Sequence, residues 1–137
     1  MIDIATLFAA LCIASISDIR TRKIPDHVHI LLLVSGILSV TLYGSDWVSR
    51  AAGFLAVGVM MLIIGLASEN LGGGDIKMGA CLAFALDLLP ACYSLLTGFG
   101  LAAIFLLIRK GCKKPDMPIP LAPFLTVGCI AALFFSN

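Results

Sequence analysis

Apolar residues occupy this sequence in long stretches that charged residues, glycines and prolines interrupt. A helix that spans the hydrocarbon core of a bilayer needs about 20 mostly apolar residues, at a rise of about 1.5 Å each. Six stretches approach this length, at residues 2–18, 27–44, 50–68, 71–89, 91–108 and 119–136. The pattern therefore predicts an all-α, polytopic integral membrane protein with about six transmembrane helices.

The fourth stretch is long enough to span only if two charged residues lie inside it. Nine residues separate Lys77 from Asp87, so the helix must begin before Lys77 and include Asp75. Asp75 then lies about one turn into the helix, near the membrane surface. A carboxylate at that depth is costly and marks a candidate functional site.

Composition agrees with a membrane protein. Of the 137 residues, 61% are hydrophobic and 12% are charged, against roughly 25% charged residues in a soluble domain. We expect a single membrane-embedded domain, residues 1–137. The net charge of +1 provides no basic surface for nucleic acid. The five cysteines form no C-x-x-C pair, so neither a zinc site nor a redox pair is expected.

The positions of the basic residues predict the topology. Lysine and arginine concentrate on the cytoplasmic side of inner-membrane proteins. Eight of the nine lie in or beside the first, third and fifth connections, and only Arg50 lies in an even connection. We therefore expect a multi-pass protein of the bacterial inner (cytoplasmic) membrane, with odd connections in the cytoplasm and both termini outside.

This topology brings two aspartates to the cytoplasmic membrane edge. Asp18 ends the first predicted span and Asp75 opens the fourth, 57 positions later. Two carboxylates that are close in a partly dry site do not both ionise readily, so one keeps a proton. The ionised one then activates water for attack on an amide carbonyl while its partner donates a proton. Such a pair needs no metal or other cofactor, and the sequence leaves open which aspartate is the base.

Three glycines, Gly72, Gly73 and Gly74, directly precede Asp75. Without Cβ atoms they let the backbone unwind or approach a substrate strand closely. They would serve equally as a helix break and C-cap after the third span. Spacing alone does not decide between a catalytic site and a solvated aspartate behind loop glycines.

Other polar residues near the aspartates have structural interpretations. Asp26 follows Pro25 at the start of the second span, where an aspartate caps free N–H groups. Lys77 lies about 200° around a helix from Asp75, so it faces away and anchors the helix at the membrane interface. His27 and His29 do not share a helix face, and no metal site is expected there.

The two aspartate segments resemble the motifs of the type IV prepilin peptidases, polytopic aspartic proteases of the GxGD class. The GxGD motif is matched by Gly72, Gly73, Gly74 and Asp75, followed by Ile76, Lys77 and Met78. The family's other aspartate motif is matched by Asp18, Ile24, Pro25 and Asp26. The segment IPLAPFL at residues 119–125 is similar to the family's last-helix sequence.

The resemblance implies an endopeptidase that cleaves the short basic leader of type IV prepilins or pseudopilins at the cytoplasmic face, usually just after a glycine and before the hydrophobic N-terminal helix. Asp18 and Asp75 would be catalytic. The supporting residues would be Gly72, Gly73, Gly74, Lys77, Ile24, Pro25 and Asp26. Expected partners are the prepilin or pseudopilin, membrane lipid, and pilus or secretion assembly machinery. Asp26 or Glu69 is a better contact for a basic leader than the basic residues of the fifth connection, which would repel it.

Larger members of the family carry a cytoplasmic insertion with paired C-x-x-C motifs and also methylate the new N-terminus. Here only about eight residues separate Asp18 from the second predicted span. We therefore expect a peptidase without methyltransferase activity, similar to the short members that process Flp-type prepilins in tight-adherence pilus systems.

Two other functions fit a small membrane protein with acidic residues. A proton-coupled transporter relays protons through carboxylates across the bilayer. Asp18 and Asp75 are expected at one face and Asp87 near the other, which leaves such a relay without middle steps. A non-enzymatic pilus or secretion assembly subunit would keep its function when both Asp18 and Asp75 are replaced.

Overall fold

The computed structural model of the chain describes residues 2–67, 72–111 and 120–135. Within these ranges the chain forms six helices and no strand, so the predicted all-α class is confirmed. The helices are α1 (Ile2–Thr21), α2 (Asp26–Tyr43), α3 (Trp47–Ala67), α4 (Gly73–Leu86), α5 (Leu88–Gly111) and α6 (Ala122–Phe135).

Among the described helices, α1, α2, α3 and α5 are long and apolar enough to cross a membrane. The helices α4 and α6 have 14 residues each, which is about 21 Å against a hydrocarbon core of roughly 30 Å. They are shorter than the predicted stretches 71–89 and 119–136. Asp75 therefore lies in the first turn of a helix outside the four candidate spans.

Local backbone geometry explains why α4 and α6 are short. Gly72 precedes α4 in an extended conformation, and Asp87 ends it with a φ of 81°, which is rare for a residue with a side chain. In α6 the second residue is Pro123, and a proline without an N–H group is tolerated only in the first turn of a helix. The helix accordingly begins at Ala122.

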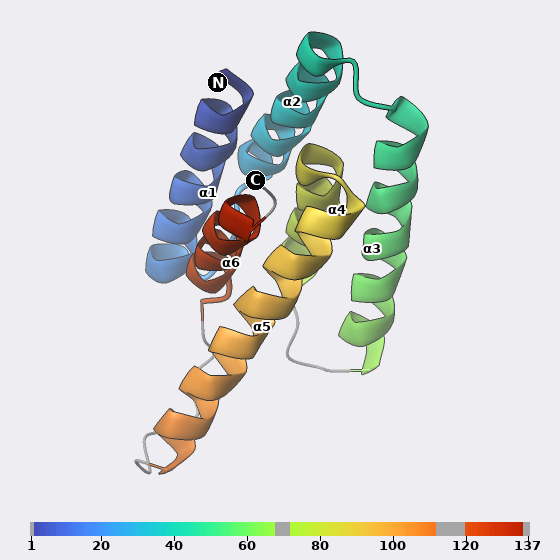
Figure 1. Ribbon diagram of the computed structural model, residues 1–137. Helices are drawn as coiled ribbons and strands as arrows, with labels where there is room; N and C mark the ends of the chain where they lie inside the picture. Colours follow the sequence, from blue (N-terminus) through green and yellow to red (C-terminus); the bar gives the residue numbers. More distant parts are fainter. Residues whose placement is uncertain (1, 68–71, 112–119, 136–137) are drawn as a thin grey trace.

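Helix α4 lies at the centre of the bundle, where it packs against α2, α3 and α5 (Figure 1). Helix α1 packs against α2 and α6, and α5 runs along α6. Glycines and alanines supply four of the seven buried residues of α4, and small residues let neighbouring helices approach closely. The ends of α1, α3 and α5 and the starts of α4 and α6 all face the bottom of Figure 1, where α5 extends well beyond the other helices. Asp18 and Asp75 therefore share one end of the bundle.

At the opposite end, Arg50 holds the C-terminus of α4. Its buried guanidinium donates hydrogen bonds to the carbonyl oxygens of Phe84 at 2.9 Å and Ala85 at 2.7 Å, and pairs with Asp87 at 3.9 Å. The last carbonyls of a helix lack partners within it, and a cation there also complements the helix dipole. In the sequence, Arg50 stands out only as the exception to the charge pattern, so this role was not predicted.

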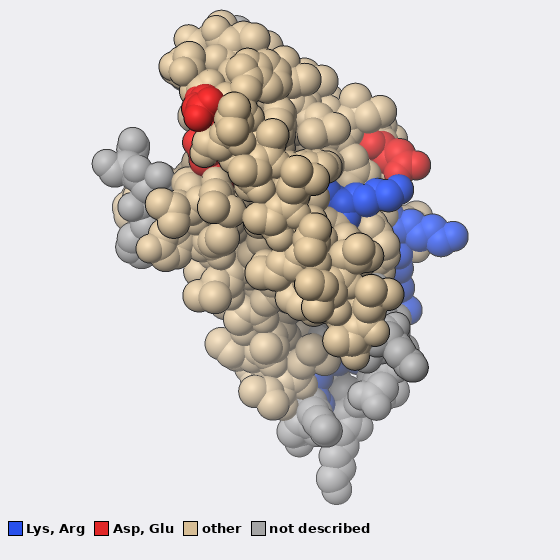
Figure 2. All heavy atoms as spheres, turned by 90° about the vertical axis from the view of Figure 1, so that its right-hand side faces the viewer, with Lys and Arg blue, Asp and Glu red and all other residues tan. Residues whose placement is uncertain are grey.

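The outer surface of the bundle is apolar. Large side chains such as Val48 and Leu66 are 74% and 80% exposed, and Figure 2 shows a face on which uncharged residues predominate while charged ones lie toward its margins. Continuous apolar surface of this kind marks contact with a membrane or a partner. Together with the four candidate spans, it supports a multi-pass membrane protein.

Helices α5 and α6 meet at two glycines. A Cβ on Gly128 would overlap the carbonyl oxygen of Ser94, and a Cβ on Gly98 would lie 3.1 Å from that of Phe124. We expect Gly128→Ala to lower the stability of the fold by roughly 1–3 kcal/mol, because the helices must move apart. Thermal unfolding in detergent measures this. Gly100→Ala is the control, since a Cβ there meets nothing within 4 Å; equal melting temperatures for both variants would contradict the close packing.

Candidate functional site

Asp18 lies in the last turns of α1 and is only 6% exposed. Its Oδ2 accepts a hydrogen bond of 2.9 Å from the backbone N–H of Ala122, the first residue of α6. The N-terminus of a helix carries unpaired N–H groups and a partial positive charge, and both favour a carboxylate. The described part of the IPLAPFL segment thus brings the start of α6 against Asp18, a contact that spacing along the sequence did not reveal.

The segment after Asp18 leaves the helix in a defined way. Arg22 has a φ of 53°, and its N–H donates to the Asp18 carbonyl oxygen at 2.9 Å. Ser17 donates its hydroxyl hydrogen to the carbonyl oxygen of Lys23 at 3.0 Å. This turn directs Ile24 onto the second motif, where its Cβ would lie 3.4 Å from a Cβ built on Gly74.

The glycines before Asp75 have different surroundings. Gly72 precedes α4, and its carbonyl oxygen accepts the N–H of Asp75 at 3.0 Å. A Cβ on Gly72 would lie 3.2 Å from Oδ2 of Asp75, whereas a Cβ on Gly73 would meet nothing within 4 Å. None of the three has a positive φ, so their small size rather than an unusual backbone conformation distinguishes them.

The two motifs line one cavity of about 340 Å³. Its residues are Asp18, Arg22, Lys23, Ile24, Gly72, Gly73, Gly74 and Asp75. The segments are far apart in sequence, and the packing of α1 beside α2 and of α2 beside α4 brings them together. The cavity has the size of a small-molecule or peptide site, with two carboxylates and two basic side chains in its wall.

The carboxylates of Asp18 and Asp75 interact electrostatically. The pKa of Asp75 is raised from 3.8 to about 6, first because burial removes water and second because the charge of Asp18 is near, while a hydrogen bond with the Gly72 backbone lowers it. One group of the pair thus holds its proton at a pH where an ordinary aspartic acid has lost it. This arrangement can donate a proton from Asp75 and accept one at Asp18.

Lys77 and the predicted supporting residues of the second helix form a separate cluster beside the cavity. The ammonium of Lys77 lies 3.6 Å from Oδ1 of Asp26, and neither residue lines the cavity that holds Asp18 and Asp75. Pro25 is the N-cap of α2 and makes no side-chain capping bond; Asp26 occupies the first turn. Asp26 therefore pairs with Lys77 across two helices, a role that sequence analysis did not consider.

His29 is the residue that sequence reasoning weighed only as a metal ligand. It is 7% exposed, and its Nε2 lies 3.2 Å from the carbonyl oxygen of Gly74, directly before Asp75. The only feature of the sequence that could have indicated this contact is the position of His29, three residues after Asp26 on a predicted helix. Across the described ranges, no group of three or more His, Cys, Asp or Glu side chains is placed to hold a metal ion. Glu69 lies outside the described residues.

Comparison with known proteins gives consistent matches. The type IV leader peptidase family matches residues 5–108, which include both aspartates. A prepilin leader peptidase/N-methyltransferase of Burkholderia pseudomallei (strain 1026b) is 32% identical over 141 residues, which cover 96% of this chain and 45% of that protein. One from Bacillus subtilis (strain 168) is 30% identical over 138 residues, 93% of this chain and 53% of that protein. The chain thus spans about half the length of these relatives, and no solved structure matches it.

Proposed function

The chain belongs to the type IV leader peptidase family, and from that premise we propose that it is a membrane-embedded aspartic endopeptidase that cleaves the basic leader of type IV prepilins or pseudopilins after a glycine. The observation that carries the proposal is the single cavity that Asp18 and Asp75 line together. The membership alone supports a prepilin leader peptidase. The aspartic mechanism rests on the carboxylate pair.

The environments of the two carboxylates suggest their roles. Asp18 accepts the N–H of Ala122 at the start of α6 and acts as the base, taking a proton from water. The water oxygen attacks the carbonyl carbon of the scissile amide while Asp75, with its raised pKa, protonates the carbonyl oxygen. The tetrahedral intermediate then collapses: the C–N bond breaks, the proton held by Asp18 passes to the leaving nitrogen, and one hydroxyl of the intermediate returns its proton to Asp75 as the carbonyl group re-forms.

The charges around the cavity set limits on how a substrate binds. Arg22 and Lys23 line the cavity beside Asp18 and repel a basic leader, so the leader has to leave toward acidic groups. Asp26, although paired with Lys77, has a side chain that is 84% exposed and can receive such a leader. The active site faces the cytoplasm in this proposal, because the described basic residues at the ends of α1 and α5 lie at the same end of the bundle as Asp75.

Leader cleavage is the activity that the carboxylate pair supports. The printed names of the relatives also include an N-methyltransferase, and the pair supplies no chemistry for methyl transfer. The expected likeness to short Flp-type members and the absence of methylation stay predictions. A proton relay is less well supported, because α4 carries only apolar side chains and one thiol between Met78 and Leu86.

The test is cleavage by purified protein in lipid nanodiscs. The substrate is a prepilin with a basic leader, a glycine at the cleavage position and its apolar segment intact. Mass spectrometry should find two products whose summed mass exceeds that of the substrate by one water. An intact substrate after prolonged incubation with folded protein would overturn the proposal.

The first two glycines of the motif should differ in their tolerance of a methyl group. Gly72→Ala should lower kcat/KM by about tenfold or more, since its Cβ crowds Oδ2 of Asp75 and shifts a carboxyl group that must be placed to within a fraction of an ångström. Gly73→Ala should retain activity within about twofold, because that Cβ enters open space. Equal losses in both variants would show that flexibility of the segment, and not room beside Asp75, is what the glycines provide.

A further inference from the structure

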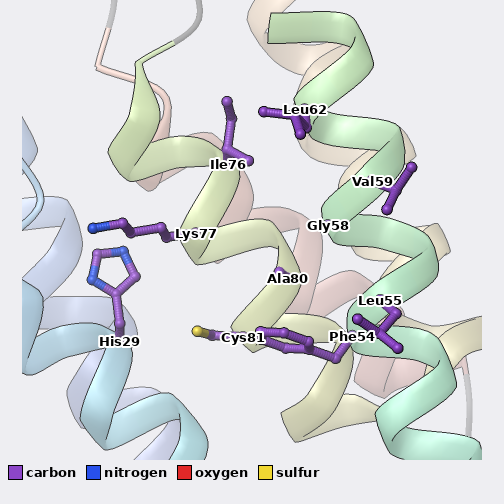
Figure 3. Close-up of a pocket in the computed structure, with 10 residues that line it drawn as sticks. All are labelled: His29, Phe54, Leu55, Gly58, Val59, Leu62, Ile76, Lys77, Ala80 and Cys81. Carbon is purple, nitrogen blue, oxygen red and sulfur yellow. The ribbon is translucent and has the colours of Figure 1, made fainter.

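A second hollow lies beside the aspartate cavity, on the outer face of α4 between α2 and α3 (Figure 3). We call it the α4 groove; it has a volume of about 330 Å³. His29 of α2 and five residues of α3 form its walls, and residues of α4 form its floor. Its lining residues are His29, Phe54, Leu55, Gly58, Val59, Leu62, Ile76, Lys77, Ala80 and Cys81.

The α4 groove lies next to the proposed active site along α4. Ile76 and Lys77 directly follow Asp75 on α4, and both line the groove. His29 lines it as well, and its Nε2 lies 3.2 Å from the carbonyl oxygen of Gly74, which lines the aspartate cavity. Asp75, which lines the cavity, and Ile76, which lines the groove, are therefore consecutive residues of α4.

The groove runs from this end into the apolar part of the bundle. Its α3 wall extends from Leu62 to Phe54, which is about 12 Å along a helix axis. Its polar groups, Lys77 and His29, lie near the aspartate end, and Figure 3 shows the Lys77 side chain directed toward His29. The rest of the lining is hydrocarbon and one thiol.

The groove is open to the lipid side of α3. Leu55 and Val59 are 64% and 54% exposed, so a membrane-embedded segment can enter sideways without passing through water. Gly58 allows α3 to approach α4 closely at the groove, since a Cβ there would lie 3.3 Å from the Cβ of Ala80. In addition, Nδ1 of His29 is buried, makes no hydrogen bond within the described structure, and lies 3.8 Å from Oδ1 of Asp26.

We propose that the α4 groove binds the apolar segment of the substrate that follows the scissile bond; this inference rests on the proposed function. The prepilin of the proposed function has a basic leader before the scissile amide and an apolar segment after it. The basic side must stay in water at the end of the bundle, and the apolar side finds beside Asp75 one hydrocarbon groove that leads into the membrane.

Two matched tryptophan variants of α3 test the proposal. Val59 lines the groove, whereas Met60 is its neighbour in sequence, 44% exposed, and does not line it. Val59→Trp fills the groove and should lower kcat/KM for a prepilin with an intact apolar segment by about tenfold, mainly through KM. Met60→Trp should stay within about twofold of wild type. Leu55→Trp, at a second exposed position in the groove, should repeat the loss.

Photo-crosslinking provides a readout that does not depend on cleavage. Benzoylphenylalanine at position 59 in an Asp75→Asn background should crosslink to the apolar segment of the prepilin, and the same group at position 60 should not. Wild-type kinetics for both groove variants, or crosslinks from position 59 to lipid alone, would overturn the inference while wild-type cleavage leaves the proposed function standing. If wild-type protein cleaves no prepilin, the proposed function and this inference fail together.

Discussion

Asp18→Asn and Asp75→Asn, each alone, should reduce leader cleavage by roughly 10²–10⁴-fold, the range that general acid–base catalysis contributes. Asparagine keeps the shape of the side chain and cannot exchange a proton. At position 18 its carbonyl oxygen can still accept the N–H of Ala122, so the packing of α6 against α1 is preserved. The loss should therefore appear in kcat, with little change in KM.

The comparison needs a variant with the same chemical change elsewhere. Asp46 is suited to this, because its Oδ1 accepts the N–H of Val48 at 3.2 Å at the start of α3, and asparagine caps helices about as well as aspartate. Asp46→Asn should cleave like wild type. Co-expression with the prepilin, followed by N-terminal sequencing of the pilin and quantification of each variant in the membrane, gives the result. Cleavage that survives in either active-site variant removes that aspartate from the mechanism and favours an assembly role.

Much of this architecture follows from the sequence because membrane helices are specified locally. Apolar stretches between charges and prolines locate six helices, and the run of glycines before Asp75 marks the start of α4. The lengths of α4 and α6 do not follow in the same way. Hydropathy at residues 87–89 and 119–121 is compatible with a helix. The positive φ of Asp87 ends α4, and the proline in the first turn of α6 sets where that helix begins.

The site was predictable only in part, for a related reason. The charge pattern predicts that Asp18 and Asp75 share one end of the bundle, but the contacts that orient them come from segments distant in sequence. Ala122 approaches Asp18 over 104 positions, and His29 approaches Gly74 over 45. No periodicity signals such pairs in a single sequence. The same holds for Arg50, whose four hydrogen-bond partners on other segments become visible only once α2, α3 and α4 are packed.

The pH dependence of cleavage should identify Asp75 as the acid. Its pKa is raised to about 6, so Asp75 is protonated below pH 6 and ionised above it. If Asp75 donates the proton, kcat/KM should fall by about tenfold per pH unit above pH 6, and should also fall in acid once both carboxyl groups are protonated. The expected profile is a bell with its alkaline limb near pH 6, and Asp46→Asn should leave that limb in place.

The stability of the fold depends on the same group over a different pH range, which separates the two effects. Because the pKa of Asp75 in the folded state lies above its ordinary value of 3.8, the folded state binds more protons than the unfolded state between pH 3.8 and about 6. Stability therefore falls as pH rises through that window and is unaffected by Asp75 at higher pH. A loss of activity between pH 6 and 8 at constant melting temperature must then come from catalysis. A kcat/KM that instead rises through pH 6 to a plateau would assign the role of base to Asp75 and that of acid to Asp18.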